Sequence, residues 1–377
     1  MNNKDIYQLI IDQKMKDGDY ISLDISLSPF EIEKFYLDYP ELINQYLITP
    51  SEYFPSINVY KGEMLEIEKM IDYKHLDRVD GFDAAIKYIR DRAATKVEDI
   101  FTFLCFNLDY KKYSFDNEYE FATHMMNLVH SKPDGYLSYI VAESSLLCHE
   151  LCKGGSGLYL ITVQNNYFEE TNTIEKLHKQ VEDKLSSIAK TLFLDDMPDI
   201  VKILLAYNQI GDLANYSKDI TQNLIHTPYG CLISGDCVCD GFAKAFYQLL
   251  KLGGIDSLVV NGQVITDKGE ENHTWNMVKL GKDYYQIDLT WDDEVAIINH
   301  YFFMRSDGLF SLHHQWDESI YPACSIDKDF KDEIQQYLTA NSDKLIAKGV
   351  QKRLISYEFI NYKGEEMKPY NRYYKKK

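Results

Sequence analysis

The chain has 377 residues, a formal net charge of −19 and a hydrophobic content of 45 %, which is enough for a packed core and argues against a disordered chain. The negative charge argues against non-specific binding to nucleic acid, which needs a cationic surface. No run approaches the roughly 18 apolar residues of a membrane span, and charged residues interrupt the N-terminus where an apolar signal region would lie. The seven cysteines are irregularly spaced and form no disulfide framework. We therefore expect a cytoplasmic protein with no nucleic-acid or membrane partner; signal-independent export would leave no mark, and nothing in the sequence sets the oligomeric state.

The N-terminal half, residues 1–190, is acidic, rich in tyrosine and mostly helical in pattern. Apolar residues at three- and four-residue steps predict three helices: 31–47, 81–107 and 172–193. Two short alternating runs predict strands: 137–141 and 158–163. We therefore expect an N-terminal α+β region, and the sequence leaves open whether it serves recognition or regulation.

The second half begins with two predicted helices, 198–210 and 240–252, separated by a loop that contains cysteines. Three strands are predicted after them: 257–264, 273–280 and 284–291. This order indicates an α+β core at 191–325. A C-terminal extension at 326–377 follows, with a helix at 331–338, a strand at 354–362 and a basic tail.

Cys239 stands directly before the apolar helix predicted at 240–252. The free N–H groups at a helix start carry partial positive charge, which lowers the pKa of a thiol from its usual value of about 8.5. Cys231 and Cys237 lack this placement, and we interpret both as small buried residues. A zinc site made by these three cysteines and His273 is disfavoured, because Cys-x-Cys is an unusual spacing and no second ligand pair follows.

His273 and Asp288 fall on two predicted strands joined by a turn near residues 280–283. One turn geometry sets residue 275 opposite 288 and another sets 273 opposite 288, but both leave His273 and Asp288 on the same face. Such neighbours lie about 5 to 8 Å apart, so the carboxylate can accept the imidazole N–H and stabilise the imidazolium. A thiol, an imidazole and a carboxylate in this relation form the general arrangement for acyl transfer by a thiolate.

Three blocks of the sequence together resemble the transglutaminase-like family, and most of all its bacterial cysteine peptidase-like branch. They read HTPYGCLISGDCVCDGFAKAFYQLLKLGGIDSLVVNG, HTWNMVKLGKDYYQIDLTWDD and HYFFMRSDGLFSLHHQWDESIYPAC. In that family a VC-x-G-[YF]-A-x-AF stretch supplies the nucleophile, an H-[AT]-WN stretch the base and a D-x-TWDD stretch the orienting acid. The resemblance covers residues 195 to 325 and assigns these roles to Cys239, His273 and Asp288.

The resemblance implies a papain-like α+β core in which a helix bearing the cysteine packs on an antiparallel sheet. It also implies cysteine-dependent acyl transfer on a peptide or protein amide, with no cofactor and no metal. Hydrolysis is the first interpretation. Crosslinking or deamidation of Gln by the same three residues, or a non-catalytic protein-interaction module that retains the fold, stay open. Candidates for a second oxyanion donor are Asn208 and Tyr229, and Trp275 is expected to line the cleft.

Two further groups receive a structural interpretation. Cys148, His149 and Cys152 lie in a segment interpreted as helical and apolar, so burial is favoured over metal binding. The adjacent His313 and His314 are interpreted as structural residues.

Overall fold

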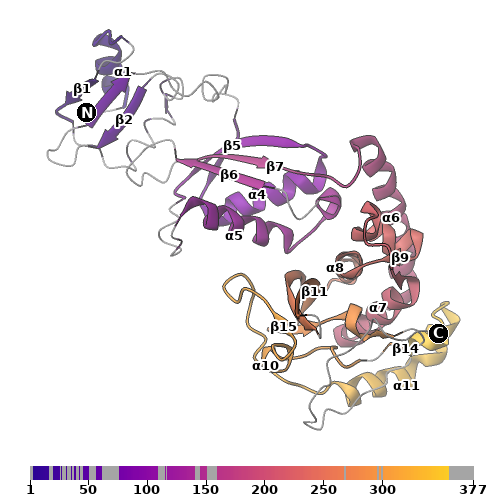
Figure 1. Cartoon of the computed structure of the whole chain (residues 1–377). Coiled ribbons are helices and arrows are strands. Elements are labelled where there is room, and N and C mark those ends of the chain that lie inside the picture. Colours follow the sequence, from indigo (N-terminus) through magenta and orange to yellow (C-terminus); the bar gives the residue numbers. More distant parts are fainter. Residues whose placement is uncertain are drawn as a thin grey trace. The chain divides into compact units, whose positions relative to one another are not determined.

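The computed structural model describes residues 3–16, 20–25, 27, 31, 35, 38–39, 42, 46–50, 57–61, 76–108, 115, 117–140, 145–150, 159–266, 269–294, 297–298 and 300–355. The chain forms two compact units (Figure 1). The first unit comprises three stretches: Met1–Asp91, Glu98–Met126 and Glu143–Asn166. The second comprises Arg92–Val97, Asn127–Ala142 and Tyr167–Lys377. The domain limits expected at residues 190 and 325 stay predictions.

The first unit contains two sheets. The smaller one is antiparallel with the order β1-β3-β2, and α1 packs beside it through Ile6 and Ile10. The larger one has the order β4-β5-β7-β6, in which only the pair β4–β5 is parallel. The bounds are α1 Asn3–Asp12, β1 Tyr20–Leu23, β2 Tyr46–Pro50, β3 Ile57–Lys61, β4 Arg78–Asp80, β5 Ile100–Phe106, β6 Ser145–Glu150 and β7 Tyr159–Gln164.

Helices α4 (Phe82–Thr95) and α5 (Glu118–His130) lie beside the larger sheet (Figure 1). The Tyr88 ring lies 4.7 Å from the Phe103 ring of β5, so α4 packs on this sheet. The helix predicted at 81–107 is therefore wrong beyond Thr95, since Ile100–Phe106 is a strand. The segment reads as a continuous apolar run, because its strand is buried on both faces over most of its length and the alternation of a half-exposed strand is lost.

Other predictions in the first half fare differently. The strand predicted at 158–163 is confirmed as β7, whereas the strand predicted at 137–141 is wrong, since Gly135–Tyr139 forms a 3-10 helix. The segment predicted to be helical around Cys148 is strand β6, where Cys148 is half-buried; Cys152 lies outside the described residues. Most of the helix predicted at 31–47 also lies outside them, and its end belongs to β2.

The second unit is built around α8 (Cys239–Leu252), which is buried along most of its length. Helices α6 (Thr171–Leu192), α7 (Asp199–Leu213) and α11 (Lys331–Ala347) contribute apolar residues to the same core. The predicted helices at 172–193, 198–210, 240–252 and 331–338 are thereby confirmed, the last with nine further residues to Ala347. Of the strand predicted at 354–362, Leu354 belongs to a 3-10 helix, and residues from 356 on lie outside the described part.

A four-stranded antiparallel sheet, in the order β12-β11-β10-β15, packs on α8. Asn276 of β11 fixes this packing, since its side-chain amide donates to the carbonyl of Ala243 in α8 at 3.0 Å. The bounds are β10 Ser257–Thr266, β11 Gly269–Leu280, β12 Asp283–Ile287 and β15 His314–Gln315. A cysteine-bearing helix on an antiparallel sheet is the α+β arrangement that the sequence predicts.

The hairpin β11–β12 turns at Gly281 and Lys282, where Gly281 has a φ of +65°. Leu280 pairs with Asp283, and the ladder continues to Asn276 and Ile287. This is the first of the two predicted registers. The strand predicted at 284–291 is shorter than expected, because the chain leaves the sheet after Ile287 and enters the helix α9 (Leu289–Asp292).

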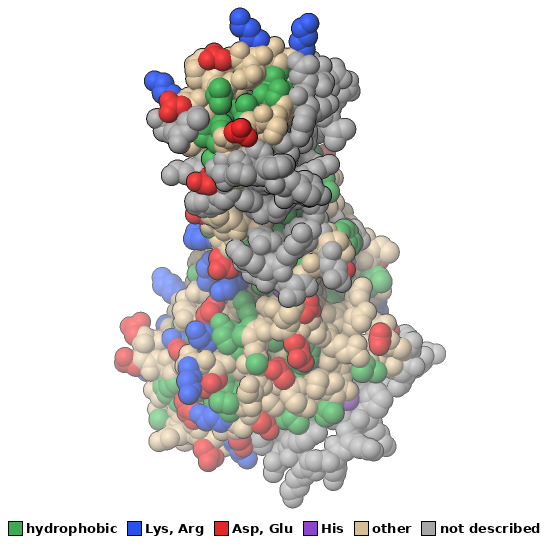
Figure 2. Space-filling view, turned by 90° about the vertical axis from the view of Figure 1, so that its left-hand side faces the viewer, with side chains coloured by type: hydrophobic (Ala, Val, Ile, Leu, Met, Phe, Trp, Pro, Cys, Tyr) green, Lys and Arg blue, Asp and Glu red, His purple; other side chains and the backbone are tan. Residues whose placement is uncertain are grey.

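Short elements complete the second unit, and no described helix is both long and apolar enough to cross a membrane. On the face drawn in Figure 2, acidic and basic side chains are interspersed over the described residues. The remaining bounds are η4 Gly135–Tyr139, β8 Asn215–Tyr216, η5 Asn223–His226, the π-helical turn Gly230–Ser234, β9 Asp236–Cys237, β13 Asp293–Glu294, β14 Ile297–Ile298, α10 Asp307–Phe310 and η7 Lys352–Ile355.

Candidate active site

Cys239 is the first residue of α8, and Val238 before it is extended, with φ −112° and ψ −173°. Val238 has no side-chain oxygen to cap this helix start, and Oδ1 of Asp240 accepts the N–H of Gly241 at 3.1 Å. Within the described residues, the N–H groups of Cys239 and Asp240 donate no hydrogen bond. Cys239 is partly exposed, whereas Cys231 and Cys237 are fully buried, as the sequence predicts. Cys239 therefore combines access to solvent with two free backbone donors.

His273 lies on β11, and its Nε2 is 2.7 Å from Oδ2 of Asp288. The pair is buried, with 6 % of the His273 side chain and none of the Asp288 side chain exposed. The two residues lie on one face of the hairpin, as either predicted register requires. Because Nε2 faces the carboxylate, Nδ1 is the ring nitrogen that remains for a reacting group.

Asp288 is held from several sides. Its Oδ1 accepts the N–H of Trp291 at 3.1 Å, which makes Asp288 the N-cap of α9. Its backbone oxygen accepts the hydroxyl of Tyr207 at 2.9 Å. Burial raises the pKa of this carboxyl, but the charge of His273 and the hydrogen bonds to its oxygens outweigh burial and lower the pKa well below the usual range. Asp288 is thus ionised and fixed in orientation.

The pKa of His273 shifts in the opposite direction. Burial lowers it, while the charge and hydrogen bond of Asp288 raise it more strongly, and the nearby Cys239 side chain also favours the cation. The net result raises the pKa of His273 to about 10. The site thereby favours an imidazolium beside Cys239, which is the partner that stabilises a thiolate.

The structure adds one residue that the sequence analysis assigned to a structural role. His314 of β15 is fully buried, and its Nε2 lies 3.0 Å from the same Oδ2 of Asp288 that faces His273. No spacing in the sequence links His314 to Asp288, since β15 pairs with β10 through only two residues. The doublet His313-His314 was the only signal available.

His273, Asp288 and His314 offer three potential metal-ligand atoms within 4.8 Å of one another. Ligands around a tetrahedral metal at about 2.0–2.1 Å are separated by roughly 3.3 Å. The observed separations of 2.7 and 3.0 Å are shorter and have the length of hydrogen bonds. The three residues therefore form a hydrogen-bonded group that a metal would have to push apart.

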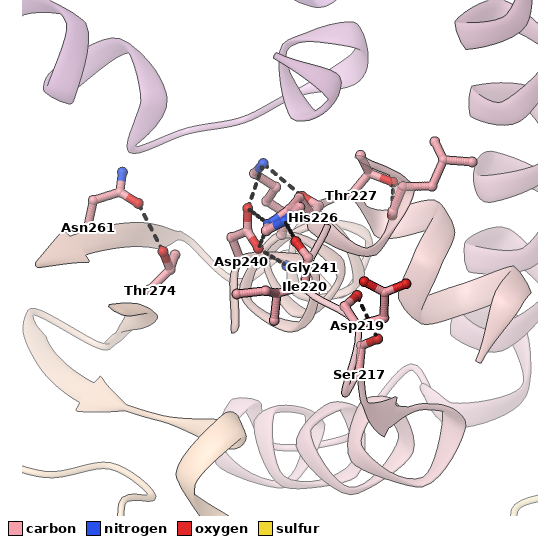
Figure 3. A network of polar contacts seen from close by, with 11 residues as sticks. Ser217, Asp219, Ile220, His226, Thr227, Asp240, Gly241, Asn261 and Thr274 are labelled. Atoms are coloured by element: carbon pink, nitrogen blue, oxygen red, sulfur yellow. Dashed lines mark hydrogen bonds and ion pairs between the residues drawn. The ribbon is translucent and has the colours of Figure 1, made fainter. Parts of the chain in front are cut away.

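A second histidine–aspartate pair begins at the residue that follows Cys239. Asp240, the second residue of α8, accepts from Nδ1 of His226 at 3.0 Å (Figure 3). The ring of Phe168 stacks on His226 with 5.5 Å between the ring centres and an interplanar angle of 5°. Lys244 donates to the backbone oxygen of His226 at 3.0 Å. The hydrogen bond that His226 donates to Asp240 raises the pKa of His226, although burial opposes this.

The three remaining sequence candidates are Asn208, Tyr229 and Trp275. The Asn208 amide donates to the Leu354 carbonyl at 3.0 Å, and its oxygen lies 2.8 Å from Nε2 of His300, so both ends of the amide are occupied. Tyr229 is partly buried against the main core at the start of the π-helical turn. Trp275 is only 1 % exposed, so the expectation that it lines a cleft is wrong. Its ring packs 6.0 Å from the ring of His273 instead.

Part of the chain matches a known protein family. Residues 186–289 match the family described as the transglutaminase-like superfamily. The chain carries a transglutaminase-like domain. The matched residues include Cys239, His273 and Asp288, but they end before His314.

Two solved structures resemble the chain distantly. One is a protein from Cytophaga hutchinsonii that is provisionally named a cysteine protease: it is 13 % identical, covers 49 % of this chain and 71 % of its own, and has a TM-score of 0.26. The other is named a TGase: it is 12 % identical, covers 92 % of this chain and 100 % of its own, and has a TM-score of 0.24. Both TM-scores are too low to bear on the assignment. No curated protein matches the sequence.

Proposed function

We propose that the transglutaminase-like domain is a cysteine-dependent acyl-transfer enzyme that acts on a peptide or protein amide and hydrolyses it. The observation that carries the proposal is the group of three residues around the start of α8. Cys239 is partly exposed at the start of α8, and its side chain interacts with His273, whose ring is held by the buried Asp288 through Nε2. Thiolates of this kind are formed by a helix N-terminus and an adjacent imidazolium acting together.

The first half-reaction begins from the Cys239 thiolate and the His273 imidazolium. The sulfur attacks the amide carbonyl carbon, a C–S bond forms, and the carbonyl electron pair moves onto oxygen. The N–H of Cys239, which has no acceptor among the described residues, is available to this oxyanion, as is the N–H of Asp240. The C–N bond then breaks, Nδ1 of His273 gives its proton to the leaving amine, and a thioester remains.

The second half-reaction reverses these roles. Nδ1 of the now neutral His273 accepts a proton from water, the water oxygen attacks the thioester, and the C–S bond breaks to release a carboxylic acid and the thiolate. An amine in place of water would give crosslinking, and a Gln side chain as the amide with water would give deamidation. Hydrolysis is chosen because the branch of the family that the motifs resemble is mostly peptidase-like.

Selective alkylation tests the proposal without knowledge of the substrate. At about pH 6, where an ordinary thiol of pKa about 8.5 is almost fully protonated, iodoacetamide should label Cys239 faster than the other cysteines. Cys239→Ser should remove the fast phase and His273→Ala should slow it. The buried Cys324→Ser is the matched control and should leave it unchanged, since burial raises the pKa of that thiol and keeps it inert.

The outcome separates an enzyme from a binding module. Slow and uniform labelling of all cysteines, with no dependence on His273, would contradict the proposal and favour a protein-interaction domain that retains the fold. Where fast labelling is found, a peptide library incubated with and without a primary amine distinguishes cleavage, crosslinking and deamidation by mass.

A further inference from the structure

We propose that His314 is a positioning residue of this site: as a neutral donor, it shares the oxygen of Asp288 that His273 uses and keeps that carboxylate ionised and aligned. The inference rests on the proposed function and adds a fourth residue to it. His314 lies outside the residues that match the family, and neither the motifs nor the comparisons assign it a role.

The geometry around Asp288 leaves little freedom. Oδ2 faces Nε2 of His273 at 2.7 Å and Nε2 of His314 at 3.0 Å, while Oδ1 accepts the N–H of Trp291. A carboxylate oxygen has two lone pairs, so two donors use both of them. The direction from which His273 can approach is thereby fixed by His314 on the other side.

Both hydrogen bonds require the proton on Nε2 of each ring. For His314 this leaves Nδ1, which is buried and has no hydrogen-bond partner among the described residues. A second proton on Nδ1 would bury a charged donor without an acceptor, whereas a bare Nδ1 lone pair costs less. The geometry therefore favours the neutral ring, and His314 gives Asp288 a hydrogen bond without adding a second positive charge.

The surroundings of His314 support the same state. Aromatic rings enclose it, with ring centres 4.0 Å away for Phe310, 4.9 Å for Trp275, 4.9 Å for Trp291 and 5.3 Å for Phe302. The titratable groups that face it are Asp288, His273 and His313. Burial lowers the pKa of His314 to about 4, against the opposing effect of Asp288.

This arrangement has a chemical consequence for Cys239. Without the His314 donor, the ionised Asp288 loses one of its three side-chain hydrogen bonds in a fully buried position. Ionised Asp288 then becomes less favourable, and so does the imidazolium it stabilises. Alkylation of Cys239, which benefits from that imidazolium, should then be slower at a given pH.

The test is the pH profile of Cys239 alkylation by iodoacetamide in the full chain. His314→Phe keeps an aromatic ring in the aromatic enclosure but removes the donor. We expect the acid limb of the profile to move up by about one pH unit, which makes labelling at about pH 6 roughly tenfold slower. His314→Gln places an amide N–H near the position of Nε2 and should restore at least half of the lost rate. His313→Phe is the matched control, because the neighbouring ring does not contact Asp288, and it should leave the profile unchanged.

The outcomes distinguish the inference from the function on which it rests. Ordinary labelling of Cys239 in the unmodified chain overturns both. Fast labelling in the unmodified chain, with the same acid limb in His314→Phe, overturns the role of His314 alone. Because His314→Phe could unfold the core, histidine ¹⁵N spectra of the unmodified chain give a second measurement: a neutral His314 with its proton on Nε2 between about pH 5 and 8 supports the inference, and a cation overturns it.

Discussion

Two histidine–aspartate pairs lie next to the same cysteine, and they differ in burial rather than in distance. His273 and Asp288 are 2.7 Å apart with 6 % and 0 % of their side chains exposed. His226 and Asp240 are 3.0 Å apart with 29 % and 21 % exposed. Asp288 receives three side-chain hydrogen bonds, whereas the Asp240 carboxylate also interacts with the cation of Lys244 at 3.7 Å.

The difference in burial indicates which pair can control the charge state of a neighbouring side chain. In the buried pair, loss of solvent strengthens the interaction between the charges and makes an unpaired partner costly. In the less buried pair, Lys244 and some solvent also interact with Asp240, so the interaction is screened more than in the buried pair. Proximity to Cys239 alone therefore does not select the histidine that we propose as the base, and substitutions in matched positions should separate the two pairs.

The largest effect is expected when the buried carboxylate loses its charge. Asp288→Asn leaves the side-chain shape but removes the partner of the buried His273 imidazolium. We expect the free energy of unfolding to fall by about 3–5 kcal/mol, as for other buried pairs that lose one partner. Urea unfolding followed by circular dichroism measures this change.

Asp240→Asn is the matched substitution in the less buried pair. It should cost about 1 kcal/mol, because ion pairs that water can reach contribute less than fully buried ones. Equal losses in the two variants would show that burial does not separate the pairs.

The next effect is a pH dependence of stability. A raised pKa in the folded chain means that His273 contributes stability in full below its unfolded pKa of about 6.5 and loses that contribution as the pH rises toward about 10. The free energy of unfolding of the unmodified chain should therefore fall between about pH 7 and 9.5 relative to that of His273→Gln. His314 acts with the opposite sign: because its folded pKa is lowered to about 4, its neutral burial costs stability as the pH falls below about 6.5.

The assignment of charge would be contradicted if the free energies of unfolding of the unmodified chain and of His273→Gln changed in parallel between about pH 7 and 9.5. His314→Phe isolates the acid side, where it should flatten the loss of stability between about pH 6.5 and 4.

The parts of this site that local patterns define could be predicted from the sequence. The helix that begins at Cys239 follows from its apolar spacing, and strand alternation places His273 and Asp288 on one face for either turn. His314 could not be found in this way, because its contact with Asp288 spans 26 residues and depends on a two-residue strand. Side-chain packing also lies beyond such patterns. Trp275 packs in a buried cluster, and its position there requires a glycine at 262, since a Cβ would stand 2.6 Å from its ring.

The smallest effect is expected from His226 of the less buried pair. His226→Gln removes the imidazole that faces Asp240, but the start of α8 keeps its backbone contacts: Val238 N–H donates to the Ile225 carbonyl at 3.2 Å, and Gly241 packs closely against the same carbonyl. The position of the Cys239 N–H should therefore be unchanged. We expect a loss of less than about 1 kcal/mol, reduced further by salt, and alkylation of Cys239 within about threefold of the unmodified rate. His273→Gln, measured in parallel, should slow alkylation far more. A comparable slowing in His226→Gln would mean that the less buried pair also controls the reactivity of Cys239, and the distinction by burial would fail.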